Sequence, residues 1–279
     1  MERQLNKNQL YNFKMYLQYE ERSLATVEKY MRDVSVFYNY VGENVFTKTD
    51  VLNYKQHLLS KYTATSANSM LAAINVFFRF NEWHELCVKQ YKIQKSAFIS
   101  EEKELTKPEY IRLIKVARQN NNERLNLIIQ TICCTGIRVS ELPYITVEAV
   151  KRGEAFVNCK GKNRKVFIVA DLRKKLLRYT NNQNITTGAI FVTRNGKHIS
   201  RHNIWRDMKA LCKEANVLPS KVFPHNLRPL FARTFYGIEK DIVKLADILG
   251  HTNVNTTRVY IVTTATEHKQ KMENMRLII

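Results

Sequence analysis

The chain has 279 residues, more than a single domain usually contains, so we expect two domains. Its hydrophobic share of 44% excludes a mainly disordered protein, and its 8 Gly and 5 Pro are too few for an all-β fold rich in tight turns. The longest uncharged apolar stretch, residues 125–137, is shorter than the roughly 20 helical residues that cross a bilayer. We therefore expect a helix-dominated protein without a membrane partner.

The first residues and the cysteines indicate a compartment. The opening MERQLNKNQL contains no apolar signal-peptide core, and the five cysteines form no CxxC pair. Neither a disulfide framework nor a zinc ribbon is indicated, so we expect a cytoplasmic chain with reduced thiols and no bound metal.

The charge balance favours a polyanionic partner. Against 25 Asp and Glu stand 45 Lys and Arg, which give a net charge of +20. Residues 1–100 hold 13 basic and 9 acidic residues, so 32 and 16 remain for residues 101–279. We expect nucleic acid as the partner, with the main phosphate-binding surface in the C-terminal part; a basic surface that serves only solubility is the alternative.

Residues 1–92 show the pattern of four amphipathic helices. The second follows Ser23, a suitable N-cap, and repeats its apolar residues at helical spacing. The third begins after Thr49 and the fourth at about Ser66. A small helical bundle is predicted, followed by a charged, aperiodic linker over residues 93–105.

The second domain is predicted over residues 106–279. It opens with Thr106 and Glu109, whose spacing matches a capping box at the start of a helix. A helix over 123–134 ends at a Thr-Gly turn, and residues 155–169 form two β-rich arms around a basic Gly/Asn turn, which predicts a hairpin. Three further elements follow: a strand pair near residues 190–196, a helix over 201–215 and a basic C-terminal helix over 266–279.

Four separated segments carry polar groups suited to chemistry. They are Arg138 in TGIRVSEL, Lys160 before the turn glycine of the hairpin, His225 and Arg228 in PHNLR, and His251 in LGH, nine residues before Tyr260. His225 and Arg228 are three residues apart near a predicted helix start, where backbone N–H groups also favour an anion. Together these two side chains are suited to hold a phosphate group.

In this order, TGIRVSEL, PHNLRPLFA and LGH followed by Tyr260 resemble the catalytic domain of tyrosine recombinases of the phage integrase family. The N-terminal helices are similar to that family's core-binding, SAM-like domain. The resemblance implies a mainly α fold with small β-hairpins, a mixed α/β catalytic domain and a two-domain, C-shaped clamp around the duplex. It also implies a site-specific recombinase that cleaves and rejoins DNA strands through a 3′-phosphotyrosine, without metal, ATP or another cofactor.

The resemblance implies a role for each residue that matches a family motif. Tyr260 would attack the phosphodiester, and Arg138 and Arg228 would hold its non-bridging oxygens, because a planar guanidinium meets two phosphate oxygens at once. Glu141 would support the site beside Arg138; a plain ion pair between these two is the alternative.

The resemblance also implies the residues that would move protons. Lys160 would protonate the leaving 5′ oxygen, His225 would act as general acid and base, and His251 would donate to the phosphate. Three basic residues around the hairpin turn are expected to contact the DNA backbone, and are alternatives to Lys160: Lys162, Arg164 and Lys165.

One position departs from the family pattern. Pro229 stands where the family usually has a histidine directly after the arginine. A proline inside a helix costs about 3 kcal/mol unless the helix kinks, and a kink directly after Arg228 would displace its guanidinium and lower activity. The alternatives to a recombinase are a type IB topoisomerase, a DNA-binding protein that has lost catalysis and, last, a metallonuclease using His225 and His251.

The resemblance finally implies the partners. We expect double-stranded DNA with inverted-repeat sites and a homo-tetramer on two such sites, assembled from monomers. The C-terminal helix over residues 266–279 would dock into a neighbouring protomer, with packing on its own domain as the alternative. No arm-binding domain is expected before the helical domain.

Overall fold

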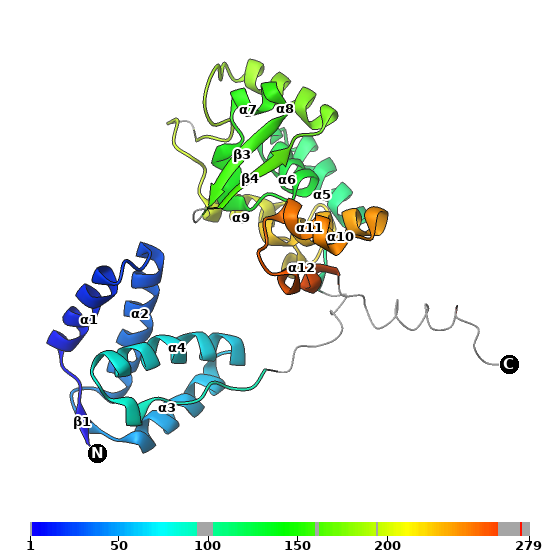
Figure 1. The fold of residues 1–279 in the computed structure, drawn as a ribbon. Coiled ribbons are helices and arrows are strands. Elements are labelled where there is room, and N and C mark those ends of the chain that lie inside the picture. The colour runs from blue at the N-terminus through cyan, green and yellow to red at the C-terminus, as the bar shows by residue number, and fades with distance from the viewer. Residues whose placement is uncertain (1, 94–102, 160–161, 194, 262–273, 275–279) are drawn as a thin grey trace. The chain divides into compact units, whose positions relative to one another are not determined.

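The computed structural model describes residues 2–93, 103–159, 162–193, 195–261 and 274 (Figure 1). The chain divides into two compact units, Met1–Lys95 and Ser96–Ile279, each with a hydrophobic core of its own. Much of the predicted linker lies outside the described residues, as do Lys160 and, except for Asn274, the predicted C-terminal helix. The predicted mainly helical fold with small β-hairpins is confirmed.

The first unit is a bundle of four helices with a two-stranded sheet. Its main elements are β1 (Arg3–Gln4), α1 (Lys7–Tyr19), α2 (Leu24–Val41), β2 (Val45–Phe46), α3 (Lys48–Lys61) and α4 (Ala64–Phe80). The strands pair antiparallel, with Arg3 opposite Phe46. Ser23 caps α2 as predicted, whereas α3 begins earlier than expected because Thr47 and Asp50 form a capping box there.

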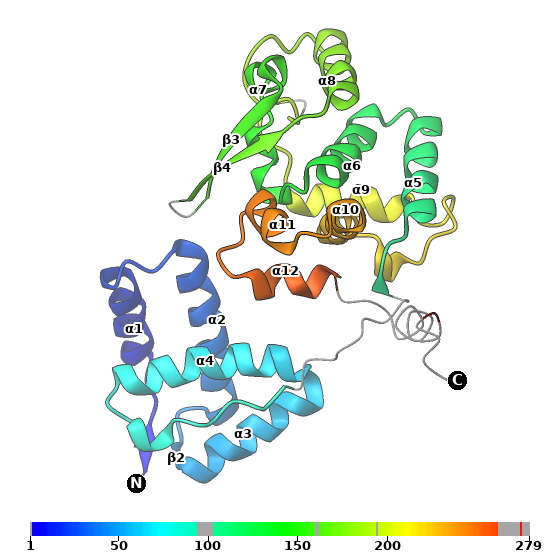
Figure 2. The same cartoon turned by 45° about the vertical axis from the view of Figure 1, so that its right-hand side comes forward.

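The second unit contains the remaining elements. They are α5 (Lys107–Gln119), α6 (Glu123–Thr135), the 3₁₀ helix η3 (Val139–Tyr144), α7 (Val147–Arg152), β3 (Glu154–Cys159), β4 (Lys162–Phe167), α8 (Ala170–Asn182), α9 (Arg201–Ala210), the 3₁₀ helix η4 (Pro219–Lys221), α10 (Pro224–Glu239), α11 (Ile242–Leu249) and α12 (Val254–Ile261). Helix α6 packs against α5, α8 and α10, and α12 packs against α10 and α11 (Figure 2). This arrangement brings the ends of α6, α10 and α11 together.

Three of the predicted boundaries in the second unit hold. The capping box of Thr106 and Glu109 opens α5, and α6 ends at the Thr-Gly turn. The predicted hairpin is confirmed: β3 and β4 pair antiparallel from Glu154 opposite Phe167 to the pair next to the turn.

Other predictions for this unit were wrong. The strand pair predicted near 190–196 is reduced to a short antiparallel contact: Val192 and His198 share one isolated bridge, and Thr193 N–H donates to the carbonyl of Lys197, without a longer strand among the described residues there. Helix α9 ends at Ala210, and the chain continues in a turn, whereas the helix was predicted to extend to residue 215.

None of the described helices is both long and apolar enough to span a membrane.

Candidate active site

The turn after α6 positions Arg138. Gly136 ends α6 in the left-handed region at φ +63°, and a Cβ atom there would lie 2.5 Å from the ring of Phe231. Only glycine therefore lets α6 end against α10. Two residues on, the backbone N–H of Arg138 donates to one carboxylate oxygen of Glu141 at 2.9 Å, and its Nη1 donates to the other at 2.7 Å.

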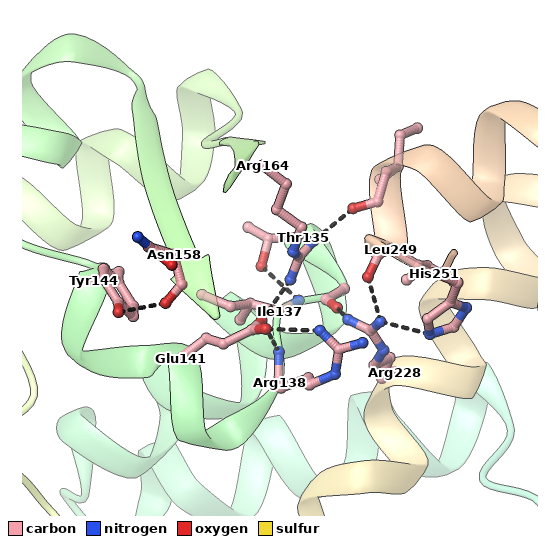
Figure 3. A network of polar contacts seen from close by, with 12 residues as sticks. Thr135, Ile137, Arg138, Glu141, Tyr144, Asn158, Arg164, Arg228, Leu249 and His251 are labelled. Atoms are coloured by element: carbon pink, nitrogen blue, oxygen red, sulfur yellow. Dashed lines mark hydrogen bonds and ion pairs between the residues drawn. The ribbon is translucent and has the colours of Figure 1, made fainter. Parts of the chain in front are cut away.

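A second guanidinium reaches Glu141 from the hairpin. Arg164 of β4 donates from Nη2 to Glu141 and from Nη1 to the carbonyl of Ile248, both at 2.5 Å (Figure 3). Burial raises the pKa of Glu141, but the hydrogen bonds from Arg138 and the charge of Arg164 outweigh burial and hold this pKa below its usual value. Glu141 is thus an ionised carboxylate between two arginines.

The position of Arg164 differs from the expectation that it contacts the DNA backbone. Its side chain is only 10% exposed, because its guanidinium is already paired with Glu141. Gly250 makes room for it: at φ +65°, a Cβ atom on Gly250 would lie 2.5 Å from Cδ of Arg164. The glycine of the LGH motif therefore admits the arginine stem beneath the turn that follows α11.

Arg228 lies on α10, which continues through Pro229 to Glu239. Its side chain is buried, and it donates to the carbonyl of Gly136, to the carbonyl of Leu249 at 2.6 Å and to Nε2 of His251 at 2.9 Å. Burial, followed by the charges of neighbouring arginines, lowers the pKa of Arg228 to about 10, so the guanidinium remains charged at neutral pH. Helix α10 is unbroken at Pro229.

His251 is held at both ring nitrogens. Besides the contact of its Nε2 with Arg228, its Nδ1 lies 2.8 Å from Oγ1 of Thr257 on α12. Burial and then the charge of Arg228 lower the pKa of His251 to about 4, so the ring is neutral at physiological pH.

Tyr260 lies between two imidazole rings. Its hydroxyl is 3.5 Å from Nε2 of His225, and its ring centroid is 5.8 Å from that of His225 and 5.6 Å from that of His251. Burial and then the charge of Arg228 lower the pKa of His225, which favours the neutral ring. The tyrosine ring packs on a small apolar cluster formed by α10 and α11, which includes Leu249.

Two cavities meet at Arg138. One, of about 650 Å³, is lined by Arg138, His225 and Arg228 together with residues of α9 that the sequence analysis did not select: Arg201, His202 and Trp205. The other, of about 700 Å³, is lined by Arg138, Glu141, Arg164 and His251. No motif singles out the α9 residues, whereas Thr257 could have been found from its position one helical turn before Tyr260.

The structure brings most of the predicted site residues into one place. The residues brought together are Arg138, Glu141, His225, Arg228, His251 and Tyr260. Lys160 lies outside the described residues, and of Lys162 only its position in β4 is described. Lys165 pairs with Glu154 at 3.0 Å and is 44% exposed. Among the described residues, no group of three or more His, Cys, Asp or Glu side chains could hold a metal ion.

Comparison with known proteins identifies the class to which this fold and site belong. Residues 103–267 match the model of the phage integrase family, and residues 10–85 match the N-terminal SAM-like domain of phage integrases. The chain belongs to the phage integrase family, and it is a tyrosine-type site-specific recombinase, an enzyme that breaks and rejoins DNA.

Relatives of similar length support this assignment. The chain is 28% identical to tyrosine recombinase XerA of Pyrococcus furiosus over 99% of this chain and 97% of the relative. It is 30% identical to tyrosine recombinase XerA of Pyrococcus horikoshii over 98% and 95%. The fold is similar to that of lambda integrase, solved as a tetramer bound to a Holliday junction, with a TM-score of 0.74 at 16% identity over 91% of this chain and 76% of that one.

Proposed function

We propose that Tyr260 is the nucleophile and that recombination proceeds through a 3′-phosphotyrosine bond. The observation that supports this most is the position of its hydroxyl, 3.5 Å from the neutral ring of His225. A phenol with a pKa of about 10 needs a base to become a nucleophile at neutral pH. His225, whose pKa is lowered by burial, has the free nitrogen lone pair that this task requires.

In the proposed reaction, the oxygen of Tyr260 forms a bond to phosphorus while the bond from phosphorus to the 5′ oxygen breaks. The phenol proton passes to His225, and the leaving oxygen takes a proton from Lys160. The reverse sequence, with a 5′ hydroxyl of another strand as the attacking group, releases the tyrosine. Because the phosphotyrosine link conserves the energy of the phosphodiester, rejoining needs neither ATP nor a metal ion.

Arg138 and Arg228 are the proposed phosphate clamp. Negative charge on the phosphoryl oxygens rises in the transition state, and preorganised cationic donors stabilise it most there. Arg138 lines both cavities, and the charge of Arg228 is retained despite burial. Nε of Arg228 is buried without a hydrogen-bond partner among the described residues, and its two Nη atoms donate to Gly136, Leu249 and His251.

We further propose that the substrate is double-stranded DNA with inverted-repeat sites. Four copies would act on two sites, assembled from monomers in the presence of DNA. The likeness to lambda integrase, which was solved as a tetramer on a Holliday junction, supports this assembly. We also propose that the reaction takes place in the cytoplasm.

Trapping the covalent intermediate tests the assignment of Tyr260. When a duplex carries a nick next to the cleavage site, cleavage releases a short fragment that bears the 5′ hydroxyl. Because this fragment diffuses away, the strand cannot be rejoined, and the protein stays covalently attached and is detected on a denaturing gel. The parent chain is expected to form the adduct, and Tyr260→Phe is expected to form none while binding the duplex with an affinity within about twofold. Tyr236→Phe is the matched control, since Tyr236 packs on the same apolar cluster. An adduct formed by Tyr260→Phe would contradict the assignment.

A plasmid assay separates recombination from simple relaxation. A recombinase exchanges strands between two sites and produces recombinant circles, whereas a type IB topoisomerase removes supercoils from a plasmid with one site. We expect recombinant products only from plasmids that carry two sites.

A further inference from the structure

The ring of His251 has a hydrogen-bond partner on each side. Arg228 lies 2.9 Å from Nε2 through its Nη2, and Thr257 lies 2.8 Å from Nδ1 through its hydroxyl oxygen. Thr257 is fully buried, so its hydroxyl cannot exchange this contact for bulk water. These contacts determine which ring nitrogen carries the proton.

A guanidinium can donate hydrogen bonds but cannot accept one. Nε2 of His251 must therefore accept from Arg228, and the proton of the neutral ring lies on Nδ1, from which it is donated to Thr257. The free protein thus holds the Nδ1–H tautomer. In this state His251 has no proton to offer from Nε2, the nitrogen that faces Arg228.

The role that the family resemblance implies for His251, donation to the phosphate, needs the other tautomer. To donate to a phosphate oxygen beside Arg228, the ring must carry its proton on Nε2 and must accept a hydrogen bond at Nδ1. Thr257 can serve both tautomers of His251, because a threonine hydroxyl can accept a hydrogen bond from Nδ1–H or donate one to an unprotonated Nδ1. A valine side chain of nearly the same shape could neither accept nor donate.

We propose that Thr257 is a positioning residue that supports both tautomers of His251 and lets the ring change from acceptor to donor when a phosphate enters. One proton leaves Nδ1 for solvent and one from solvent joins Nε2, so the charge of the ring does not change. At the same time the Thr257 hydroxyl turns from acceptor to donor. This inference rests on the proposed function, with His251 as the phosphate donor that the family resemblance implies.

The position of Thr257 in α12 gives this contact a second consequence. Thr257 lies three residues before Tyr260, one helical turn away on the same side of the helix. The hydrogen bond from His251 therefore also ties the helix that carries the nucleophile to the ring beside Arg228. Loss of the Thr257 hydroxyl should therefore weaken the positioning of the His251 ring and of helix α12, which carries Tyr260.

Kinetics of variants give the first test. Thr257→Val should lower the rate of adduct formation about tenfold, as expected for a buried ring nitrogen that loses its partner, with DNA affinity within about twofold of the parent. Thr257→Ser retains a hydroxyl and should recover most of the rate. Thr256→Val is the matched control, because Thr256 is an exposed neighbour on the same helix, and its rate should stay within about twofold of the parent. An unchanged rate for Thr257→Val would overturn the proposal.

Nitrogen NMR of ring-labelled histidine gives the second test, with the His251 signals assigned by their loss in His251→Phe. The free parent protein should show a protonated Nδ1 and an unprotonated Nε2. In the complex of Tyr260→Phe with intact duplex, the pattern should be reversed. A protonated Nε2 in the free protein, or an unchanged pattern in the complex, would overturn the proposal. The measurement on free protein does not depend on cleavage, so a failure of the proposed function would be recognised separately by the absence of any adduct from the parent chain.

Discussion

At the centre of the site, the carboxylate of Glu141 lies between the guanidinium groups of Arg138 and Arg164. A buried charge is tolerated when its partners satisfy it, and removing one partner leaves the other charge in a medium of low polarity. The two arginines differ in what else they contact. Arg138 lines both cavities, whereas Arg164 is tied to the carbonyl of Ile248 and so holds the hairpin against the end of α11.

Replacing Arg164 tests whether it acts through Glu141 rather than on DNA. Arg164→Met should lower the free energy of unfolding by on the order of 2 kcal/mol, because Glu141 loses one of its two partners and the Ile248 carbonyl loses its donor. Adduct formation should also slow, since Arg138 then depends on a less firmly held carboxylate. Urea unfolding measures the change in stability, and the nicked duplex described above measures the rate of adduct formation.

The control for this prediction is Lys165→Met on the same strand. Lys165 is exposed, and its contacts with Glu154 and with the ring of Phe156 are at the surface, so this variant should keep the stability of the parent within about 0.5 kcal/mol and weaken DNA binding. If Arg164→Met behaves like Lys165→Met, then Arg164 contacts the DNA backbone as the sequence suggested, and its pairing with Glu141 has little energetic weight.

The low pKa of His251 predicts a dependence of stability on pH. Its folded pKa of about 4 lies below the ordinary value of 6.5, so the unfolded chain binds more protons between these values. The free energy of unfolding linked to His251 is therefore highest above pH 6.5, where the ring is neutral in both states, and it falls as the pH decreases toward 4. His251→Phe should therefore flatten the loss of stability over this range, as measured by urea midpoints at successive pH values.

A substitution elsewhere controls for the mere loss of a histidine. His84→Phe replaces an exposed histidine in the first unit, and the variant should keep the pH dependence of the parent. The prediction fails if His251→Phe loses as much stability as the parent chain between pH 6.5 and 4. His225, whose pKa is lowered in the same direction, and the carboxylate of Glu141, whose pKa is lowered by its arginine partners, both contribute to the slope that remains.

At the scale of elements, α10 carries both His225 and Arg228, and Pro229 follows directly. The proline removes one backbone donor, so the carbonyl of His225 lacks its usual partner one turn on. The helix nevertheless extends to Glu239, and Arg228 keeps its contacts with the ends of α6 and α11. The expected displacement of Arg228 therefore has no support in the contacts observed, although a cost in stability is still expected.

Pro229→Ala restores the missing donor and should raise the melting temperature. Because Arg228 already has its contacts, the rate of adduct formation should stay within about twofold of the parent. Pro229→His, which also restores the side chain usual in the family, should gain similar stability. A large gain in rate for the alanine variant would show that the proline does misplace Arg228 in the parent.

Local signals in the sequence predicted the elements of this unit well where a few adjacent residues determine the structure. The capping box of Thr106 and Glu109 and the two β-rich arms of the hairpin are of this kind. Near residues 190–196 the local sequence predicted a strand pair, but only one isolated bridge forms, and Ile190 and Phe191 are buried in the core of this unit. Arg164 is a second case: neighbouring lysines suggested DNA contact, while its partner Glu141 is 23 residues away.

At the scale of the whole molecule, the two units have separate cores. The core residues of the first unit end at Val88, and those of the second begin at Leu105. Each unit therefore contains the apolar contacts that its own fold needs, and we expect each to fold when expressed alone. The charge is divided unequally, since residues 101–279 hold 32 of the 45 basic residues and 16 of the 25 acidic ones.

This division predicts how salt affects DNA binding. Each phosphate neutralised by a basic side chain contributes about −0.9 to the slope of log affinity against log salt, so about six contacts would cost roughly 10³-fold between 50 and 200 mM. The full chain should show a slope of this size in fluorescence anisotropy with a duplex site. The unit Ser96–Ile279 alone should retain most of the slope but bind less tightly, because it carries most of the excess positive charge and lacks the contacts of the first unit. An affinity of the full chain that is insensitive to salt, or a slope carried mainly by Met1–Lys95, would contradict the placement of the phosphate-binding surface on the catalytic unit.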